Sequence, residues 1–460
     1  MTYRLPDLEI PADNPFQNDS LDREPVVKFL SKLIGRLDGP FVMAIDSPWG
    51  SGKTTLVRML MEDLKSNEFQ CIYFNAWDVD YVTDPLVSLV SSIESINRGA
   101  AVGHMKTVKK VATLLFKRSL IVGAKVLTMG TLDLGEEVNA AAAELASDTV
   151  GDIVDAFNKE RELLDQFRTA LTLAVDQLPN EGKKPKLVFF IDELDRCRPT
   201  FTIELLERVK HLFNVKNIIF VLSIDKQQLE VSTAAVYGAS INSREYLRRF
   251  IDLEYGIPAA NSRKYTESLI TRFGWDTILA GSDENDWNEN ERKKFIESFT
   301  LLSNVMELSL RARERCITRL RIVMDEENAR DFSPHLVALL IVLRSNQPQL
   351  FKDFINGDAS ANTVMESILS LPKGKDLQSD SYGHLIHAHL LDVDIDHFED
   401  NKRRLEMKSN DEGVDASERA YVKKVLTTNQ QRTLRELDYL RVKERFARIA
   451  PLIDLAAMIK

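Results

Sequence analysis

The fold of this chain is decided by the stretch Asp46-Ser-Pro-Trp-Gly-Ser-Gly-Lys-Thr-Thr55. It follows an apolar run, residues 41–45, that is typical of a buried strand, and it leads into residues 56–64, which have helical spacing. A glycine-rich turn between a strand and a helix aims backbone N–H groups at phosphates, and the positive end of the helix adds to the attraction. The sequence therefore predicts a loop that binds the phosphates of a nucleotide.

Three residue types in this loop carry the expected chemistry. Gly50 and Gly52 can adopt a positive φ and let the backbone approach the ligand closely. Lys53 can reach the outer phosphates, and the hydroxyl of Thr54 can ligand Mg²⁺. Ser47 stands where the usual G-x-x-x-x-G-K-[ST] pattern has its first glycine, and the alternative is a chance Gly-Lys-Thr in a loop. The flanking strand and helix favour the phosphate loop, whose candidate nucleotide-binding residues are Trp49, Gly50, Ser51, Gly52, Lys53, Thr54 and Thr55.

A pair of acids ends a second apolar run. Asp192 and Glu193 follow residues 187–191 directly. Ionised carboxylates at the edge of a core are unfavourable unless something positive lies nearby, and Mg²⁺ with its waters suits that place. Asp192 is the candidate metal residue beside Thr54, and Glu193 is the candidate general base that polarises the attacking water. Two alternatives stay open: the acids could cap the helix that follows, and Asp195 with Arg196 could form a structural ion pair.

Strand-like and helical patterns alternate along the first half of the chain, which implies an α/β fold with a mainly parallel sheet. The strand-like runs are residues 41–45, 70–75, 186–191, 217–224 and 250–257. Helical patterns fill residues 84–178 and most of the chain after 259. We expect a P-loop core at 1–258 that contains a helical insert at about 84–178, a helical region at 259–330, and a C-terminal helical domain at 331–460.

The bulk composition excludes several classes of protein. The net charge of -10 argues against general nucleic-acid binding, although a local basic patch remains possible. The three cysteines are far apart and show neither a disulfide framework nor a zinc spacing, which suits the reducing cytoplasm that we expect. The first 30 residues do not resemble a signal peptide. No run of about 18 apolar residues predicts a spanning helix.

Taken in order, these motifs resemble the KAP family of P-loop NTPases, within the class that carries an additional strand and a catalytic glutamate. The resemblance spans about residues 20–325. Its signals are Leu21–Glu24, Trp49–Thr55, Phe74–Trp77, Ile191–Cys197, Ile219–Asp225, Tyr246–Ile251 and Leu310–Arg311.

The resemblance implies a sheet of order 5-1-4-3-2, ATP with Mg²⁺ as cofactors, and a C-terminal helical lid. It implies that Asp192 and Glu193 have the roles given above and that Arg23 lies in the lead-in to the nucleotide pocket. Arg248 and Arg249 resemble an arginine-finger site, which a neighbouring subunit supplies, and Arg311 resembles a lid-borne sensor. The alternative for these arginines is an ordinary solvated face.

Two features depart from the family pattern. Many members have Asp-Asp where this chain has Asp192-Glu193, and many insert two membrane-spanning helices after the second strand. Here that insert carries Lys117, Arg118 and Lys125 among its apolar residues, so we expect a helical module that does not span a membrane. Residues 101–130 hold six basic and no acidic residues, whereas residues 131–166 hold ten acidic and two basic residues. The basic half could contact a membrane surface or nucleic acid, but a hairpin with the acidic half or an oligomer contact is favoured.

The tail carries four of the seven histidines, His384, His387, His389 and His397, among aspartates. A metal site is conceivable there, and solvated polar residues are the favoured interpretation.

The leading functional hypothesis is an ATPase whose cycle is coupled to conformational change or assembly, as a homo-oligomer or with a partner protein. The alternatives are a nucleotide-gated scaffold with little turnover and a nuclease or toxin in residues 330–460, for which no motif is evident. The resemblance also implies a possible place in prokaryotic genome defence.

Overall fold

A computed structural model describes residue 5 and residues 8–82, 84–93, 102–127, 150–274, 289–324, 333–433 and 439–454. The chain forms two compact units. The first, the P-loop unit, comprises residues 8–19 and 23–259, and the second, the C-terminal unit, comprises residues 1–7, 20–22 and 260–460. Within the residues described, no helix combines the length and the apolar character needed to cross a bilayer.

The P-loop unit alternates strands and helices. Its strands are β1 (Phe41–Asp46), β2 (Gln70–Asn75), β3 (Leu187–Asp192), β4 (Ile218–Ile224) and β5 (Leu253–Gly256). Its α-helices are α1 (Glu24–Arg36), α2 (Lys53–Ser66), α3 (Pro85–Ser92), α4 (Val102–Leu127), α6 (Val150–Asp176), α7 (Pro199–Leu212), α8 (Lys226–Tyr237) and α9 (Ser243–Leu247). Short 3₁₀ turns are η1 (Trp77–Val79), η4 (Leu178–Glu181) and η5 (Leu194–Arg196).

The five strands form one sheet in the order β2-β3-β4-β1-β5, and every neighbouring pair is parallel. This confirms the predicted order 5-1-4-3-2. The last strand is shorter than the predicted run at 250–257. Phe250 and Ile251 are buried in the turn after α9, where their backbone N–H groups donate to the carbonyl of Leu247. Phe250 and Ile251 are therefore apolar because they pack into the core on one face of the sheet, and they are not part of β5.

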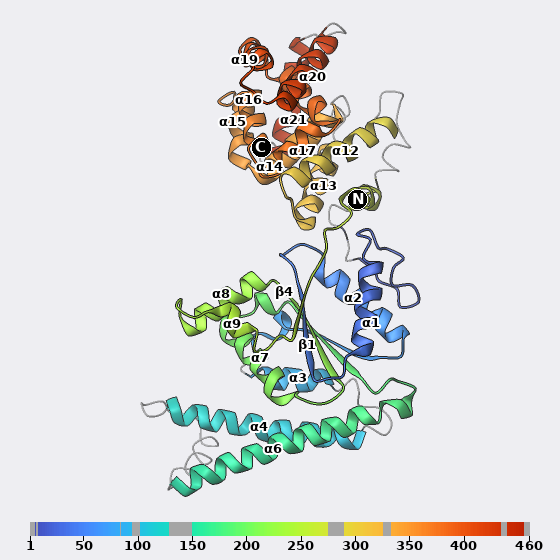
Figure 1. The fold of residues 1–460 in the computed structure, drawn as a ribbon, viewed down its shortest axis with the longest axis vertical. Coiled ribbons are helices and arrows are strands. Elements are labelled where there is room, and N and C mark those ends of the chain that lie inside the picture. Colours follow the sequence, from blue (N-terminus) through green and yellow to red (C-terminus); the bar gives the residue numbers. More distant parts are fainter. Residues whose placement is uncertain are drawn as a thin grey trace. The chain divides into compact units, whose positions relative to one another are not determined.

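Helices cover both faces of the sheet (Figure 1). On one face, α1 and α2 pack through Leu30, Leu56 and Leu60 onto alternate strand residues such as Met43 and Val221. On the other face, α3, α4, α6, α7, α8 and α9 share a second cluster with the intervening strand residues. Burial of both faces explains why β3 and β4 are buried throughout and, apart from Asp192 and Ser223 near their ends, carry apolar residues that do not alternate with polar ones.

The insert between β2 and β3 contains two long helices that lie side by side, α4 and α6 (Figure 1). Met105 and Val108 of α4, with Phe167 and Leu171 of α6, belong to the same apolar cluster as α3 and α7. The favoured pairing of the two halves of the insert is thus confirmed for these helices. The side chains of Lys117, Arg118 and Lys125, and residues 131–149 of the predicted acidic half, lie outside what the structure describes.

The C-terminal unit is helical, as predicted, and has its own apolar core. Its helices are α10 (Ser262–Arg272), α12 (Glu289–Val305), α13 (Leu310–Met324), α14 (Pro334–Asn346), α15 (Pro348–Asn356), α16 (Ala361–Leu369), α17 (Gly374–Ser379), α18 (Gly383–Val393), η7 (Ile395–His397), α19 (Phe398–Asn410), α20 (Ala416–Thr433) and α21 (Tyr439–Asp454). The predicted split between a lid and a later domain near residue 330 falls on residues outside the described ranges and stays a prediction.

The prediction that the histidines and aspartates of the tail are solvated is wrong for several of them. His387 and Asp392 are each only 3% exposed, and Asp394 is also buried. Asp392 accepts hydrogen bonds from Asn429 (2.8 Å) and Arg432 (2.6 Å), and Asp394 accepts one from Asn401 (2.6 Å). Buried polar groups require such partners, so these residues hold helices together. In the described part of the tail, no group of three or more His, Cys, Asp or Glu side chains is placed to hold a metal ion.

Candidate functional site

The phosphate loop joins β1 to α2 and has the backbone that its glycines predict. Gly50 and Gly52 have φ angles of 77° and 87°, in the region that favours glycine. Gly52 is the N-cap of α2, and no side chain caps this helix. Backbone N–H groups at the start of α2 are therefore left to a ligand or solvent. Ser47 is not among the described residues with positive φ, so this position does not require the glycine of the usual pattern.

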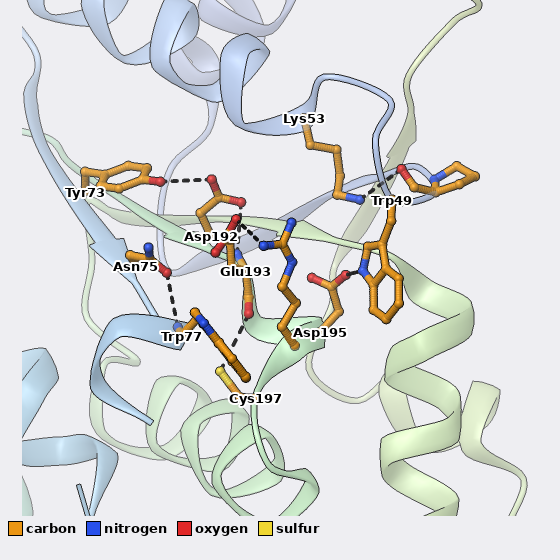
Figure 2. A network of polar contacts seen from close by, with 11 residues as sticks. Trp49, Lys53, Tyr73, Asn75, Trp77, Asp192, Glu193, Asp195 and Cys197 are labelled. Carbon is orange, nitrogen blue, oxygen red and sulfur yellow. Dashed lines mark hydrogen bonds and ion pairs between the residues drawn. The ribbon is translucent and has the colours of Figure 1, made fainter. Parts of the chain in front are cut away.

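The sheet brings the phosphate loop and the acidic strand end together. β1 and β3 are both neighbours of β4, and Asp46 lies opposite Ile224 while Asp192 lies opposite Ser223. The carboxyl ends of the three strands are thus level. Asp192 is 1% exposed at the end of β3. Figure 2 shows Lys53 on the loop side, facing Asp192, Glu193 and Asp195.

Lys53 is the buried cation of this site, with 9% exposure. Its Nζ donates to the carbonyl oxygens of Ser47 (2.5 Å) and Pro48 (3.3 Å) within its own loop. Burial lowers the pKa of Lys53, and the nearby carboxylates oppose that change, Asp195 most strongly and then Asp225, Asp192 and Asp46. The lysine therefore lies in a region of concentrated negative charge, which a divalent cation would balance.

Glu193 has an unusual conformation at the end of β3. Its φ is 60°, a left-handed value that a non-glycine residue adopts at some conformational cost. Its Oε1 forms an ion pair of 2.9 Å with Arg196. Burial raises the pKa of Glu193, and Arg196 opposes this. The alternative in which the acids cap the next helix is wrong, because α7 has Arg198 at its N-cap and no capping side chain.

The alternative of an ion pair between Asp195 and Arg196 is also wrong. Arg196 pairs with Glu193, and Asp195 accepts a hydrogen bond from the indole Nε1 of Trp49 instead (Figure 2). The physical reason is the one-turn spacing: Glu193 and Arg196 lie three residues apart around η5, so they face each other, whereas adjacent residues do not.

Two residues of the site were missed by sequence reasoning. Asp225 follows β4 and accepts the backbone N–H of Trp49 over 3.2 Å. Tyr73 of β2 donates its hydroxyl to Asp192 over 2.9 Å. Asp225 could have been predicted, because the run at 219–225 ends in this aspartate and the carboxyl ends of parallel strands lie at one edge of the sheet. Nothing in the spacing of Tyr73 distinguished it from a strand residue.

Of the predicted arginines, three lie in the P-loop unit and one lies in the C-terminal unit. Arg23 is 3% exposed at the N-cap of α1, where it donates to the carbonyl of Pro258 over 2.6 Å and its Nε has no partner. Arg248 and Arg249 are exposed just after α9; Arg248 pairs with Glu245 at 2.5 Å, and Arg249 lies over the ring of Tyr246. Arg311 is exposed on α13 of the C-terminal unit. The functional roles of these four residues stay predictions.

The residues present fit a magnesium ion bound with a triphosphate. Carboxylate and hydroxyl oxygens are the ligands that Mg²⁺ takes in proteins. Asp192 supplies a carboxylate at the strand end, Thr54 supplies a hydroxyl in the first turn of α2, and the glycine conformations leave backbone donors for phosphate. The hydroxyl of Ser51 in the same loop is buried and has no partner.

Comparison with known proteins agrees with this geometry. The KAP family P-loop domain matches residues 23–326. An uncharacterized protein of Methanocaldococcus jannaschii is 25% identical over 179 residues, which cover 34% of this chain and 90% of that protein.

Two solved structures are similar over nearly the whole chain but at low identity. The ORC2 protein of Aeropyrum pernix is 16% identical, covers 95% of both chains and has a TM-score of 0.34. The Cdc6p protein of Pyrobaculum aerophilum is 13% identical, covers 98% of this chain and 96% of its own, and has a TM-score of 0.36. The family assignment rests on the domain match and on the motifs.

Proposed function

The chain belongs to the KAP family of P-loop domains, and we propose that it is an ATPase whose nucleotide cycle is coupled to conformational change or assembly. One observation carries the proposal. Lys53 of the phosphate loop lies within the field of Asp46, Asp192, Asp195 and Asp225, which three parallel strands bring to one edge of the sheet. A buried lysine, uncapped helix N–H groups and a carboxylate cluster together suit a magnesium–triphosphate.

Each residue of the site has a defined part in this proposal. Backbone N–H groups of residues 50–55 bind the phosphates, and Lys53 bonds the outer ones in place of its own loop carbonyls. Asp192 and Thr54 would hold Mg²⁺, which supplies charge neutralisation on the phosphates when it is bound. Glu193 accepts a proton from the attacking water through the carboxylate oxygen that Arg196 does not hold.

The position of β5 supports a role in trans for the arginines. β5 pairs with β1 from Met43 to Asp46, so residues just before β5 lie toward the start of β1, whereas the phosphate loop lies at its end. Arg248 and Arg249 therefore point to a second subunit's site as their target, and a homo-oligomer is the assembly that supplies one. Arg311 is proposed as the sensor of the lid, and Arg23 as a residue of the nucleotide pocket.

The decisive experiment measures ATP binding and phosphate release in the full-length chain with Mg²⁺. Lys53→Ala abolishes both, whereas Glu193→Gln keeps binding and loses release by at least about a hundredfold, as expected for a general base. The matched control is Lys65→Ala, at the exposed end of the same helix, which leaves both unchanged. Purified wild-type protein that ignores ATP would contradict the proposal.

A nucleotide-gated scaffold is the second candidate, and the Glu193–Arg196 ion pair favours it. A base that is paired at 2.9 Å is held back from water until the pair opens. In this candidate, wild-type chain binds ATP and oligomerises with negligible phosphate release, and Arg196→Ala raises the release. Turnover that falls in Arg196→Ala would favour the ATPase.

The oligomeric state and the proposed role in genome defence are tested by separate experiments. Mass in solution is measured with and without a non-hydrolysable ATP analogue, and a strict monomer in both states removes the finger role from Arg248 and Arg249. A place in prokaryotic genome defence predicts that bacteria expressing the chain resist bacteriophage and that the Lys53→Ala variant does not protect them. The three buried free cysteines suit the cytoplasm for such a role.

A further inference from the structure

We propose that Asp195 is a positioning residue for the phosphate loop: through the indole of Trp49, its carboxylate holds residues 47–50 in the conformation that receives phosphates. The inference rests on the proposed nucleotide binding and names the contact that prepares the loop for it. It assigns Asp195 a role other than the ion pair with Arg196 that the sequence left open as an alternative.

Trp49 forms hydrogen bonds with residues that follow two different strands, β3 and β4. Its indole Nε1 donates to Oδ2 of Asp195, which follows β3, and its backbone N–H donates to Oδ2 of Asp225, which follows β4. Next to it, the N–H of Ser47 donates to the carbonyl of Ile224 over 3.2 Å. Both carboxylates are buried, with 6% and 8% exposure. The first half of the loop is thus anchored to the sheet edge before α2 begins.

The hydrogen bond, and not packing, fixes the indole. Trp49 is 46% exposed, so less apolar surface is buried than for a tryptophan in the core. Asp195, by contrast, is desolvated: burial raises its pKa, and the bond from Trp49 is the strongest of the interactions that oppose this. A buried carboxylate needs donors. The indole of Trp49 is its side-chain donor (Figure 2), and backbone N–H groups of Asp195 and Asp225 also lower this pKa. The indole bond therefore ties the position of the loop to Asp195.

The Trp49–Asp195 hydrogen bond is expected to change the entropy of nucleotide binding. Ordering a backbone residue costs on the order of 1–2 kcal/mol, and a loop with two left-handed glycines has more freedom than most to lose. A contact that orders the loop beforehand removes part of this cost from nucleotide binding. We therefore expect the Trp49–Asp195 bond to act on the affinity for ATP and on KM, while kcat at saturating ATP stays within about twofold.

Three variants separate the bond from the charge. Trp49→Phe keeps an aromatic ring and removes the indole donor. Asp195→Ala removes the acceptor. Asp195→Asn is the matched control, because the amide oxygen accepts the same hydrogen while the negative charge beside Lys53 is lost. Titration of each full-length variant with a fluorescent ATP analogue gives the dissociation constant, phosphate release gives KM and kcat, and denaturant unfolding reports whether each variant is folded.

Trp49→Phe and Asp195→Ala are each expected to weaken binding about tenfold, the usual value for a hydrogen bond to a charged group. The double variant is no weaker than either single one, because both remove the same contact. Asp195→Asn keeps the acceptor, so its loss of affinity is expected to be clearly smaller than that of Asp195→Ala.

Two results overturn the inference. One is wild-type affinity in folded Trp49→Phe, and the other is a loss in Asp195→Asn as large as in Asp195→Ala, which would assign the effect to charge. If Trp49→Phe does not fold, the contrast between Asp195→Ala and Asp195→Asn decides alone. Failure of the underlying function is distinguishable, because wild-type protein would then show no ATP binding for any variant to weaken.

Discussion

The hydroxyl of Tyr73 donates a 2.9 Å hydrogen bond to Oδ2 of Asp192, from the strand next to it in the sheet. The other oxygen, Oδ1, accepts the backbone N–H of Glu193 over 2.9 Å. Asp192 is 1% exposed, so these two donors define the rotamer of the carboxylate. Burial raises the pKa of Tyr73, and Asp192 raises it further, so the tyrosine stays a donor at physiological pH. Tyr73 thus orients the candidate metal residue of the site.

Tyr73→Phe is the first prediction. Removing the hydroxyl leaves one oxygen of a buried carboxylate without its donor, which destabilises the fold by about 1–3 kcal/mol. It also loosens Asp192, so we expect Mg²⁺ to strengthen nucleotide binding less than in wild type. The measurement is the ATP dissociation constant with Mg²⁺ and with EDTA, and only the Mg²⁺ value should rise.

Tyr81→Phe is the control for this change, because Tyr81 is 82% exposed and its hydroxyl is available to water. It should alter neither unfolding nor binding. A Tyr73→Phe chain whose affinity changes equally with and without Mg²⁺ would show that the hydroxyl does not act through Asp192.

Gly52→Ala is the second prediction. Gly52 has φ 87° at the start of α2, so a methyl group there forces strain of about 1–2 kcal/mol or a shift of the loop. The expected result is lower stability together with ATP affinity that is weaker by at least about tenfold. Gly182→Ala is the matched control: Gly182 has φ 72° with no atom near its side-chain position, and it lies at the end of η4, away from the loop. The control should lose stability and keep affinity. Equal affinity in the two variants would exclude Gly52 from phosphate binding.

Features encoded within a short stretch could be predicted from the sequence. The strands β1 to β4 begin and end within one residue of the predicted runs, because apolar runs that are buried on both faces have no competing interpretation as surface. The order of the strands followed from the resemblance. The glycine conformations at 50 and 52 followed from local backbone sterics, which depend on no distant residue.

Partners brought together by the fold could not be predicted. Tyr73 and Asp192 are 119 residues apart, and Trp49 and Asp195 are 146 residues apart. No short sequence pattern contains both members of either pair, so neither contact could be predicted from spacing. The alternative of an Asp195–Arg196 ion pair is wrong because side chains of adjacent residues in a helical turn do not face each other, and Arg196 pairs with Glu193 instead. The burial of Asp392 and Asp394 in the tail was also not predicted. Their hydrogen-bond partners lie on other helices, α16, α19 and α20, which only the fold brings to them.

Phe189→Ala is the third prediction and concerns the core behind the site. Phe189 is fully buried in the middle of β3, stacked on Phe220 at 5.3 Å between ring centroids and close to Phe74 and Phe213. Removing the ring leaves a cavity between the sheet and its helices, which costs about 3–5 kcal/mol of unfolding free energy. Denaturant unfolding measures it. Phe29→Ala, at a position that is 54% exposed, should cost much less, and a comparable cost would refute the assignment of Phe189 to the core.

The fourth prediction concerns the acid stability of the C-terminal unit. Burial lowers the pKa of His335 to about 4, with smaller contributions from Lys294, Arg432 and His384. Its Nδ1 lies 2.7 Å from Oγ of Ser298, and its ring lies beside those of His389 and Tyr382. Since the unfolded chain has an ordinary histidine pKa near 6.5, it binds more protons than the native state between pH 4 and 6.5.

The sign of the effect follows from this difference. The stability of the native state is fully present above pH 6.5 and falls as the pH is lowered, because protonation favours the unfolded chain. The loss from His335 alone should reach roughly 2 kcal/mol at pH 5, given about 1.4 kcal/mol per pH unit for one proton. Denaturant unfolding of the full-length chain at pH 7 and pH 5, followed by circular dichroism, measures it. His335→Gln keeps a partner for Ser298 and cannot titrate in this range, so its stability should fall less with pH. An identical fall in wild type and variant would mean that folding does not lower the pKa of His335.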